Sequence, residues 1–118
     1  MGGVEARNFA SPDETRTPEK TTVELVGLGG GQIGRYTFQP GWRWSDHIKP
    51  VVKTDRCQVD HLGYVVSGTL HVEHEDGSVG EVSDGDVYHV GPGHDAWVIG
   101  NEPVVLVEFQ GAAQYAKA

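Results

Sequence analysis

The sequence predicts an all-β protein built as a double-sheet jelly roll, an architecture also called a double-stranded β-helix. Three observations support this prediction. No segment of the 118 residues shows a convincing apolar helical period. Short β-rich segments recur at intervals of roughly 8–12 residues, and glycine-rich turns separate them. A jelly roll closes about eight to ten such strands without leaving long edges exposed.

Size and composition limit the classes of protein that the chain can be. At 118 residues it is long enough for one hydrophobic core. It has no apolar run near the roughly 18 residues of a membrane helix, and its first residues lack the pattern of a secretion signal, so we expect the cytoplasm. The net charge of −8 and the nine scattered Lys and Arg residues disfavour nucleic acid as a partner. The lone cysteine, Cys57, agrees with a reducing compartment.

The first part of the chain divides into an arm and a hairpin. Residues 1–20 are rich in Pro, Gly, Ser, Thr and charge. We expect a flexible N-terminal arm there, because these residues bury too little surface to offset the entropy of ordering. Residues 21–28 and 32–39 are β-rich on either side of three glycines at 29–31, which predicts a hairpin.

Two tryptophans follow in the segment GWRWS. We expect Trp42 and Trp44 on one face of a strand. Their indoles would pack a barrel wall or a dimer contact, because aromatic side chains carry large apolar area. Stacking on a ligand is the alternative. His47, just before Pro50, is expected at the surface rather than in a site.

The middle of the chain holds most of the candidate chemical side chains. In residues 57–66, alternation places Cys57 and His61 on one face, and apolar residues on both faces predict a central strand. A Ser-Gly turn leads into the next strand, and an Asp-Gly turn ends it in a hairpin. His71 and His74 lie on that strand, and we expect both to be exposed.

The last part of the chain supplies the closing strands. After the turn Gly91-Pro92-Gly93, the segment HDAWVIG places His94 on the same face as two apolar residues. Residues 104–109, VVLVEF, predict an apolar, β-branched strand that closes the sheet. Residues 111–118 are weakly helical and are expected to form a fraying C-terminal tail.

These turns resemble the two motifs of the cupins, a superfamily of small jelly-roll barrels. The first motif ends with an acidic residue, six residues and Gly, and the second reads G-x5-P-x-G-x2-H-x3-N. Here Gly68 takes the end of the first motif, and Gly85 with Gly91-Pro92-Gly93 takes the second. The hairpin at 69–84 between them has a suitable length. The resemblance implies a small stand-alone cupin barrel over residues 21–110, with the arm and the tail outside it.

The ligand positions of the family carry other residues in this chain. In the family, a His-x-His pair precedes the acidic residue of the first motif, which is usually Glu. That Glu falls on His61, the second His of the pair on Cys57 and the first on Asp55. The His of the second motif falls on Ala96. Cys57, His61 and His94 are nevertheless metal-binding residue types. We expect them to hold a divalent metal, with Zn, Fe, Cu or Ni as candidates. The alternative is two hydrogen-bonded barrel histidines beside a small buried cysteine.

A shared metal ion requires a bend between Cys57 and His61. Four residues of extended strand span roughly 13 Å, too far for two bonds of about 2.1–2.3 Å to one ion. The resemblance implies such a bend, because the family places its own ligands at the same spacing. Without a metal, Asp55 and Asp60 are expected to raise the pKa of Cys57, which argues against a free cysteine nucleophile.

The sequence leaves three functions open. The first is a small cupin that binds a metal ion, a small molecule or both in its lumen, with no identified reaction. The second is a metal-dependent, Fe(II)-type oxygenase, and the third is a metal-free isomerase or lyase with His61 or His94 as general base. We also expect a homodimer, because a small jelly roll has edge strands to cover.

Overall fold

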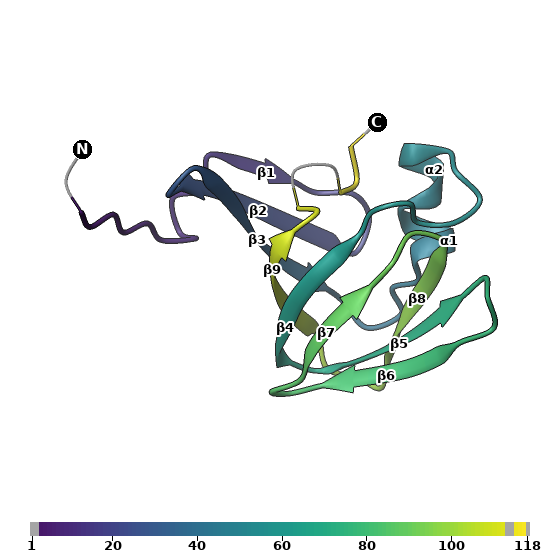
Figure 1. The fold of residues 1–118 in the computed structure, drawn as a ribbon. Coiled ribbons are helices and arrows are strands. Elements are labelled where there is room, and N and C mark those ends of the chain that lie inside the picture. Colours follow the sequence, from purple (N-terminus) through teal and green to yellow (C-terminus); the bar gives the residue numbers. More distant parts are fainter. Residues whose placement is uncertain (1–2, 113–114, 118) are drawn as a thin grey trace.

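The computed structural model describes residues 3–112 and 115–117. Within these ranges the chain forms nine strands and two one-turn helices (Figure 1). Neither of these helices is long and apolar enough to cross a membrane, and the cytoplasmic location stays a prediction. In chain order the elements are β1 (Glu14–Arg16), β2 (Thr21–Leu28), β3 (Gly31–Phe38), α1 (Trp44–His47), α2 (Lys49–Val52), β4 (His61–Ser67), β5 (Thr69–His74), β6 (Val79–Ser83), β7 (Val87–Val90), β8 (His94–Ile99) and β9 (Val104–Gln110).

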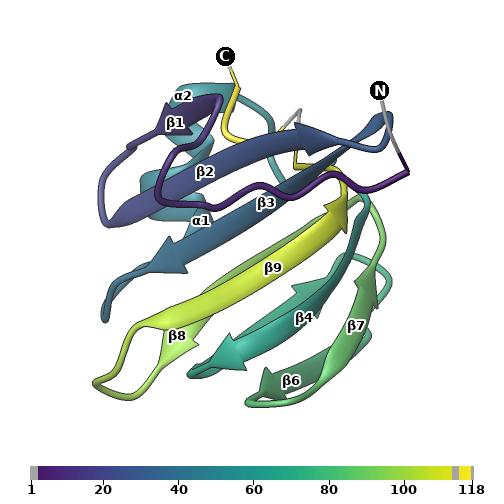
Figure 2. The same ribbon diagram turned by 90° about the vertical axis from the view of Figure 1, so that its left-hand side faces the viewer.

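Two antiparallel sheets face each other and enclose the core. The larger sheet has the strand order β1-β2-β3-β9-β4-β7, and the smaller has the order β6-β5-β8. The chain crosses from one sheet to the other between β4 and β5, between β6 and β7, between β7 and β8, and between β8 and β9, which is the route of a jelly roll. Figure 2 shows the outer face of the larger sheet, with the smaller sheet behind it. The predicted all-β, double-sheet fold is confirmed.

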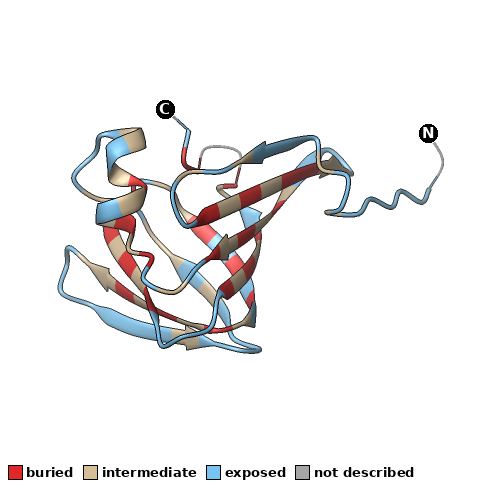
Figure 3. Cartoon of the chain, turned by 180° about the vertical axis from the view of Figure 1, so that it is seen from behind, coloured by how far each residue is buried: buried red, intermediate tan, exposed pale blue. Residues whose placement is uncertain are grey.

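Burial alternates along the strands that form the walls. In β4, His61, Gly63 and Val65 are buried, while Leu62 and Tyr64 between them are exposed. Figure 3 shows the same alternation as separate red bands along the strands. Inward side chains of both sheets therefore meet in one core, where each buried Val or Leu contributes about 1.5–3 kcal/mol relative to an exposed one.

Three glycines of the predicted motifs adopt the left-handed backbone that favours glycine. Their φ angles are 89° at Gly68, 89° at Gly85 and 97° at Gly93. At Gly68 a Cβ atom would also lie 2.5 Å from the carbonyl oxygen of Pro103 and 2.8 Å from the Cα atom of Val104. A side chain therefore cannot fit at the turn that joins the two sheets between β4 and β5.

Parts of both predicted flexible ends are ordered against the barrel. Residues 14–16 form β1, which pairs with β2. Arg16 donates hydrogen bonds to the carbonyl oxygens of Tyr115 at 2.6 Å and Ala112 at 3.4 Å. The predicted tail is therefore not frayed at Tyr115, whose ring is buried. This ring offers far more apolar area than its small neighbours do. Residues 113–114 and 118 of the predicted tail lie outside the described residues.

The segment GWRWS differs from the predicted strand. Trp44 opens the helix α1, and the backbone N–H of Ser45 in its first turn donates to Asp95 of β8 at 3.1 Å. Trp42 and Trp44 are only 2% and 1% exposed, so the predicted packing inside the barrel wall is present. The same burial removes both indoles from any dimer contact, which corrects that alternative.

Candidate metal centre

The structure brings Cys57, His61 and His94 together inside the barrel. The possible ligand atoms of these three buried side chains all lie within 4.8 Å of one another. His61 opens β4 and His94 opens β8. Cys57 lies beside His94 because their backbones form an isolated antiparallel bridge, in which the N–H of Cys57 donates to the carbonyl of His94 at 2.8 Å.

The backbone between Cys57 and His61 is not extended strand. Residues 58–60 have no regular secondary structure, and β4 begins only at His61. As a result, Cys57 Sγ lies 3.6 Å from His61 Nε2, whereas four extended residues would span roughly 13 Å. The bend that a shared ion requires is therefore present.

Both imidazoles of the trio use Nδ1 to hold their orientation. The Nδ1 of His61 lies 2.6 Å from Oε1 of Glu108 on β9, and the Nδ1 of His94 lies 2.7 Å from the carbonyl oxygen of Gly91. A carboxylate and a carbonyl oxygen only accept hydrogen bonds, so Nδ1 carries the proton in both rings. Each Nε2 is then left for the interior of the trio.

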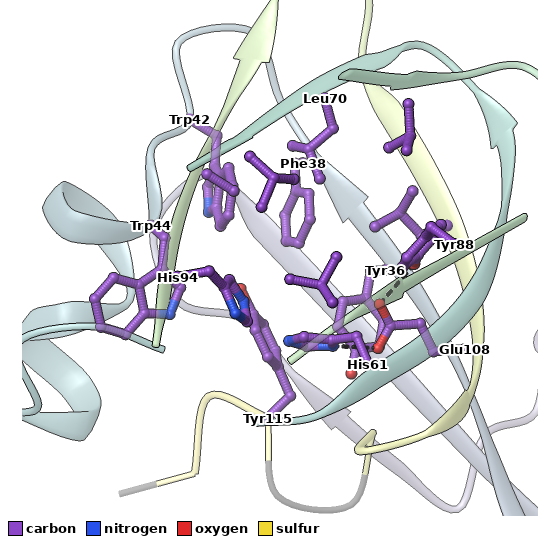
Figure 4. Close-up of a pocket in the computed structure, with 15 residues that line it drawn as sticks. Tyr36, Phe38, Trp42, Trp44, His61, Leu70, Tyr88, His94, Glu108 and Tyr115 are labelled. Carbon is purple, nitrogen blue, oxygen red and sulfur yellow. Dashed lines mark hydrogen bonds and ion pairs between the residues drawn. The ribbon is translucent and has the colours of Figure 1, made fainter. Parts of the chain in front are cut away.

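Glu108 is fixed in turn from the neighbouring strands. The hydroxyl of Tyr88 on β7 donates to its second oxygen at 2.6 Å (Figure 4). β4 runs between β7 and β9, and its Gly63 lies opposite both residues. A Cβ atom at Gly63 would lie 2.7 Å from the Tyr88 hydroxyl and 2.9 Å from Cγ of Glu108. The missing side chain at Gly63 thus lets the tyrosine reach across β4 to the carboxylate.

The two histidines change the acidity of the thiol. Burial raises the pKa of Cys57, but hydrogen bonds with His61 and His94 lower it more, from an ordinary value of 9.0 to about 6. Burial lowers the pKa of His61, while hydrogen bonds with Cys57 and Glu108 raise it to about 10. Between these two pKa values, metal-free Cys57 and His61 are expected to form a thiolate–imidazolium pair. A metal ion would displace the proton, because it binds thiolate and neutral imidazole.

Two acidic residues expected to raise the pKa of Cys57 are engaged elsewhere. Asp55 is fully exposed, with its carboxylate 3.8 Å from Nζ of Lys49, and Asp60 pairs with His89 at 2.8 Å. The expectation is therefore wrong. Solvent screens the charge of Asp55, and the carboxylate of Asp60 is paired with His89. Two imidazoles, in contrast, face the sulfur of Cys57 directly.

The lumen beside the trio is a narrow cavity with aromatic and aliphatic walls. It has a volume of about 30 Å³, and His61, His94 and Glu108 form its polar part (Figure 4). Because about 10–15 Å³ is the minimum that admits one water molecule, a cavity of this size has room for only a few non-hydrogen atoms. Half of the remaining lining residues are aromatic, and the other half are aliphatic. These aromatic residues are Tyr36, Phe38, Trp42, Trp44, Tyr88 and Tyr115.

The histidines expected at the surface have structural contacts instead. His47 accepts a hydrogen bond from the backbone at the start of α1. His71 stacks on Trp97, with ring centres 4.4 Å apart, and Nε2 of His74 donates to the carbonyl of Pro92 at 2.7 Å. All three are half-buried rather than exposed. These contacts lie outside the trio.

Glu108 and Tyr115 are the functional-site residues that sequence reasoning missed. Glu108 lies in the run VVLVEF, which we interpreted only as an apolar strand. A signal was present, because alternation puts Glu108 on the inward face with Val104 and Leu106, and a buried carboxylate requires a partner. Tyr115 carried no comparable signal. The centre of its ring lies 5.5 Å from that of His61, which precedes it by 54 residues.

Comparisons with solved structures agree with this architecture, whereas no protein-family model and no curated protein sequence matches the chain. A cupin-like protein from Thermotoga maritima is 16% identical, with a TM-score of 0.53 over 78% of this chain and 68% of its own. KdgF from Halomonas sp. is 20% identical, with a TM-score of 0.58 over 83% and 87%. The polyketide cyclase RemF from Streptomyces resistomycificus is 13% identical, with a TM-score of 0.62 over 89% and 77%.

The fold and the buried trio define a small jelly-roll protein with a candidate metal site in its lumen. At these identities the likeness establishes the fold and leaves the activity open. The jelly-roll fold is similar to that of the cupin-like protein from Thermotoga maritima, in agreement with the resemblance of the turn glycines.

Proposed function

We propose that this cupin binds one divalent transition metal ion through Cys57 Sγ, His61 Nε2 and His94 Nε2. The orientation of the two imidazoles carries the proposal. A carboxylate holds Nδ1 of His61 and a backbone carbonyl holds Nδ1 of His94, which leaves both Nε2 atoms beside the thiol. Proteins hold metal-binding histidines in this way, because the second hydrogen bond fixes the tautomer and the ring.

The donor set favours zinc as the ion to test. Thiolate and imidazole suit zinc or copper, whereas non-haem Fe(II) oxygenases use two histidines and a carboxylate. The Fe(II) oxygenase alternative therefore has less support. Three protein ligands leave one tetrahedral position free for water or a small molecule. A zinc ion bound there would supply a Lewis acid, and Glu108 would orient His61 toward it.

A metal-free isomerase or lyase is the second candidate, and one observation favours it. With Nδ1 of His94 donating to Gly91, the Nε2 atom of the neutral ring carries the lone pair and faces the trio. It could accept a proton from a molecule in the lumen as a general base. Metal content separates this candidate from the first.

The experiment is elemental analysis of protein purified without chelator and without affinity nickel. We expect near-stoichiometric metal, or stoichiometric uptake of added Zn(II). Cys57→Ser and His61→Ala should each lower the metal content, while His71→Ala, on the outer side of the smaller sheet beside Trp97, should not. Protein that holds no metal, and takes up neither Zn(II) nor Fe(II), would reject the proposal and leave the metal-free candidate.

We also propose a homodimer, through a different surface from the one the tryptophans suggested. The outer face of β4, β7 and β9 carries exposed apolar side chains, which in a soluble protein indicate an interface. A twofold axis would let this face cover itself in a second copy. The residues are Leu62, Tyr64, Val66, Val87 and Phe109. Light scattering should give a dimer that Tyr64→Lys converts to a monomer; a monomeric parent chain would end the proposal.

A further inference from the structure

We infer that the lumen beside the trio binds a small, uncharged molecule that presents a carbonyl oxygen, such as an amide, an aldehyde or a ketone. The inference rests on the proposed function only for the charge of the metal-loaded site. The hydrogen-bond donors, size and lining of the cavity support it independently.

The lumen contains buried hydrogen-bond donors that lack acceptors. Nε1 of Trp42 and Nε1 of Trp44 have no hydrogen-bond partner among the described residues, and both residues line the cavity. They are 2% and 1% exposed, respectively. An indole N–H can only donate, and buried donors in folded proteins are nearly always paired. A guest with an acceptor oxygen would satisfy them.

The two indoles are held in place before any guest arrives. The ring of Trp42 stacks on Phe38, with centres 3.8 Å apart and planes 12° apart. Trp44 is fixed by the first turn of α1, and in Figure 4 its nitrogen edge is turned toward His94. A preorganised donor loses little entropy on binding. The acceptor oxygen of a guest would therefore lie on the His94 side of the lumen.

Charge selects a neutral guest over an anion. No Lys or Arg is among the described residues that line the cavity. With a divalent ion bound by the Cys57 thiolate, the ion, the thiolate and the Glu108 carboxylate sum to zero. An anion would then be buried with no cationic side chain to pair with it, which is costly. A cation would face the positive ends of the indole N–H groups.

Size and lining restrict the rest of the guest. The cavity volume of about 30 Å³ admits only a few non-hydrogen atoms. Leu70, Val72, Val82 and Val90 line it on the side of the smaller sheet and β7. These side chains suit a methyl or short alkyl group and offer no further polar contact. The carbonyl end would thus face the indoles and the trio, and the alkyl end these aliphatic residues.

Three compounds of the same shape test the inference. Acetamide, acetate and acetamidinium are neutral, anionic and cationic, respectively, and nearly isosteric. The chain has three tryptophans, so a proton–nitrogen NMR spectrum of labelled protein contains three indole signals. Trp→Phe variants assign these signals. Trp97, which stacks on His71 and Arg43 outside the lumen, is the internal control.

We expect acetamide to move the Trp42 and Trp44 signals saturably, with a Kd in the millimolar or upper micromolar range, and to leave Trp97 unmoved. Acetate and acetamidinium should move neither. Trp42→Phe and Trp44→Phe keep an aromatic ring and remove the donor, so each should weaken acetamide binding by about threefold to tenfold. Trp97→Phe should not weaken it.

The titrations are run on zinc-loaded and on metal-free protein, so that the two proposals fail separately. Saturable acetamide shifts in a protein that takes up no zinc would retain the ligand inference and reject the metal site. A zinc-loaded protein in which acetamide moves no lumen signal would overturn the inference, because water alone would then satisfy the indoles. Stronger shifts with acetate or acetamidinium than with acetamide would also overturn it.

Discussion

The two imidazoles of the candidate centre are supported by different regions of the molecule. His61 depends on a side chain that is distant in sequence, because Glu108 on β9 accepts its Nδ1 proton at 2.6 Å. His94 depends on its own loop, because the backbone carbonyl of Gly91 accepts its Nδ1 proton at 2.7 Å. The first support can be removed by mutation, whereas the second is part of the main chain.

This difference indicates how the two halves of the site are specified. The loop before β8 carries its own acceptor, so His94 is positioned as soon as the turn at Gly91-Pro92-Gly93 forms. The orientation of His61 requires three neighbouring strands, β7, β4 and β9, to be in register. The His61 half should therefore be the more sensitive to substitutions outside the trio.

The largest effect is expected from removing either imidazole. His61→Ala and His94→Ala should each weaken zinc binding by more than about 100-fold, because losing a ligand costs more than losing one of its hydrogen-bond partners. Competition with a chromophoric chelator measures the affinity. If one variant bound zinc as tightly as the parent chain, the histidine replaced in it would not be a ligand. His61 and His94 could then not be compared as two halves of one site.

Removing the support of His61 is expected to cost less. Glu108→Gln keeps the volume but loses the charge and should weaken zinc binding by about 10- to 100-fold. Tyr88→Phe, which removes only the hydrogen bond to Glu108, is the matched variant and should have a smaller effect. Equal affinities for the parent and Glu108→Gln proteins would show that Glu108 does not orient the ligand.

A methyl group at Gly63 should disturb the same support. Its Cβ atom would lie 2.7 Å from both the Tyr88 hydroxyl and the carbonyl oxygen of Val107. Overpacking of this kind costs about 1–3 kcal/mol. Gly63→Ala should therefore lower the Tm and weaken zinc binding, whereas Gly80→Ala, where a Cβ meets nothing within 4 Å, should affect neither. An unchanged Tm in Gly63→Ala would contradict the packing.

The pH dependence of the metal-free thiol tests both imidazoles together. Cys57 should ionise with a pKa of about 6 instead of 9.0, which ultraviolet absorbance of the thiolate measures. His61→Ala and His94→Ala should each move this pKa upward. An inflection near 9.0 in the parent protein would show that the imidazoles do not stabilise the thiolate.

The same titrations have a consequence for stability. The lowered pKa of Cys57 contributes stability that is complete above 9.0 and is lost as pH falls through about 6. The raised pKa of His61 contributes stability that is complete below 6.5 and is lost as pH rises through about 10. Between 6.5 and 9.0 the two slopes oppose each other, so this pair should leave the free energy of unfolding nearly independent of pH there.

The smallest effect is expected on the His94 side. His74→Ala removes the hydrogen bond to the carbonyl of Pro92 in the loop before β8. Zinc affinity should fall by less than about threefold, because the Gly91 carbonyl still orients His94 and one such bond contributes only about 0.5–1.5 kcal/mol. A loss as large as that in Glu108→Gln would show that both histidines depend equally on distant side chains.

The fold could be predicted because its signals are local. Alternation in β2 and β4, and glycines at turns with left-handed backbone such as Gly68 and Gly93, repeat along the sequence. The trio could be predicted from residue type and face. The helices α1 and α2 could not, because four residues each are too few to show a helical period.

The support of the site could not be predicted in the same way. Glu108 lies 47 residues from His61, and nothing near it in the sequence indicates its partner. The acidity of Cys57 was wrongly expected to follow its sequence neighbours Asp55 and Asp60, whereas it follows two rings brought to it by β4 and β8. In both cases tertiary contacts decide, and these depend on the pairing of strands rather than on local composition.

Cys57 is the only cysteine of the chain, and the single methionine is the first residue. A cobalt(II) ion bound to a thiolate absorbs light through charge transfer from sulfur, and here such a band could arise from one position alone. Absorbance of the protein after addition of cobalt(II) would therefore report on Cys57 directly, and no background cysteine has to be removed first.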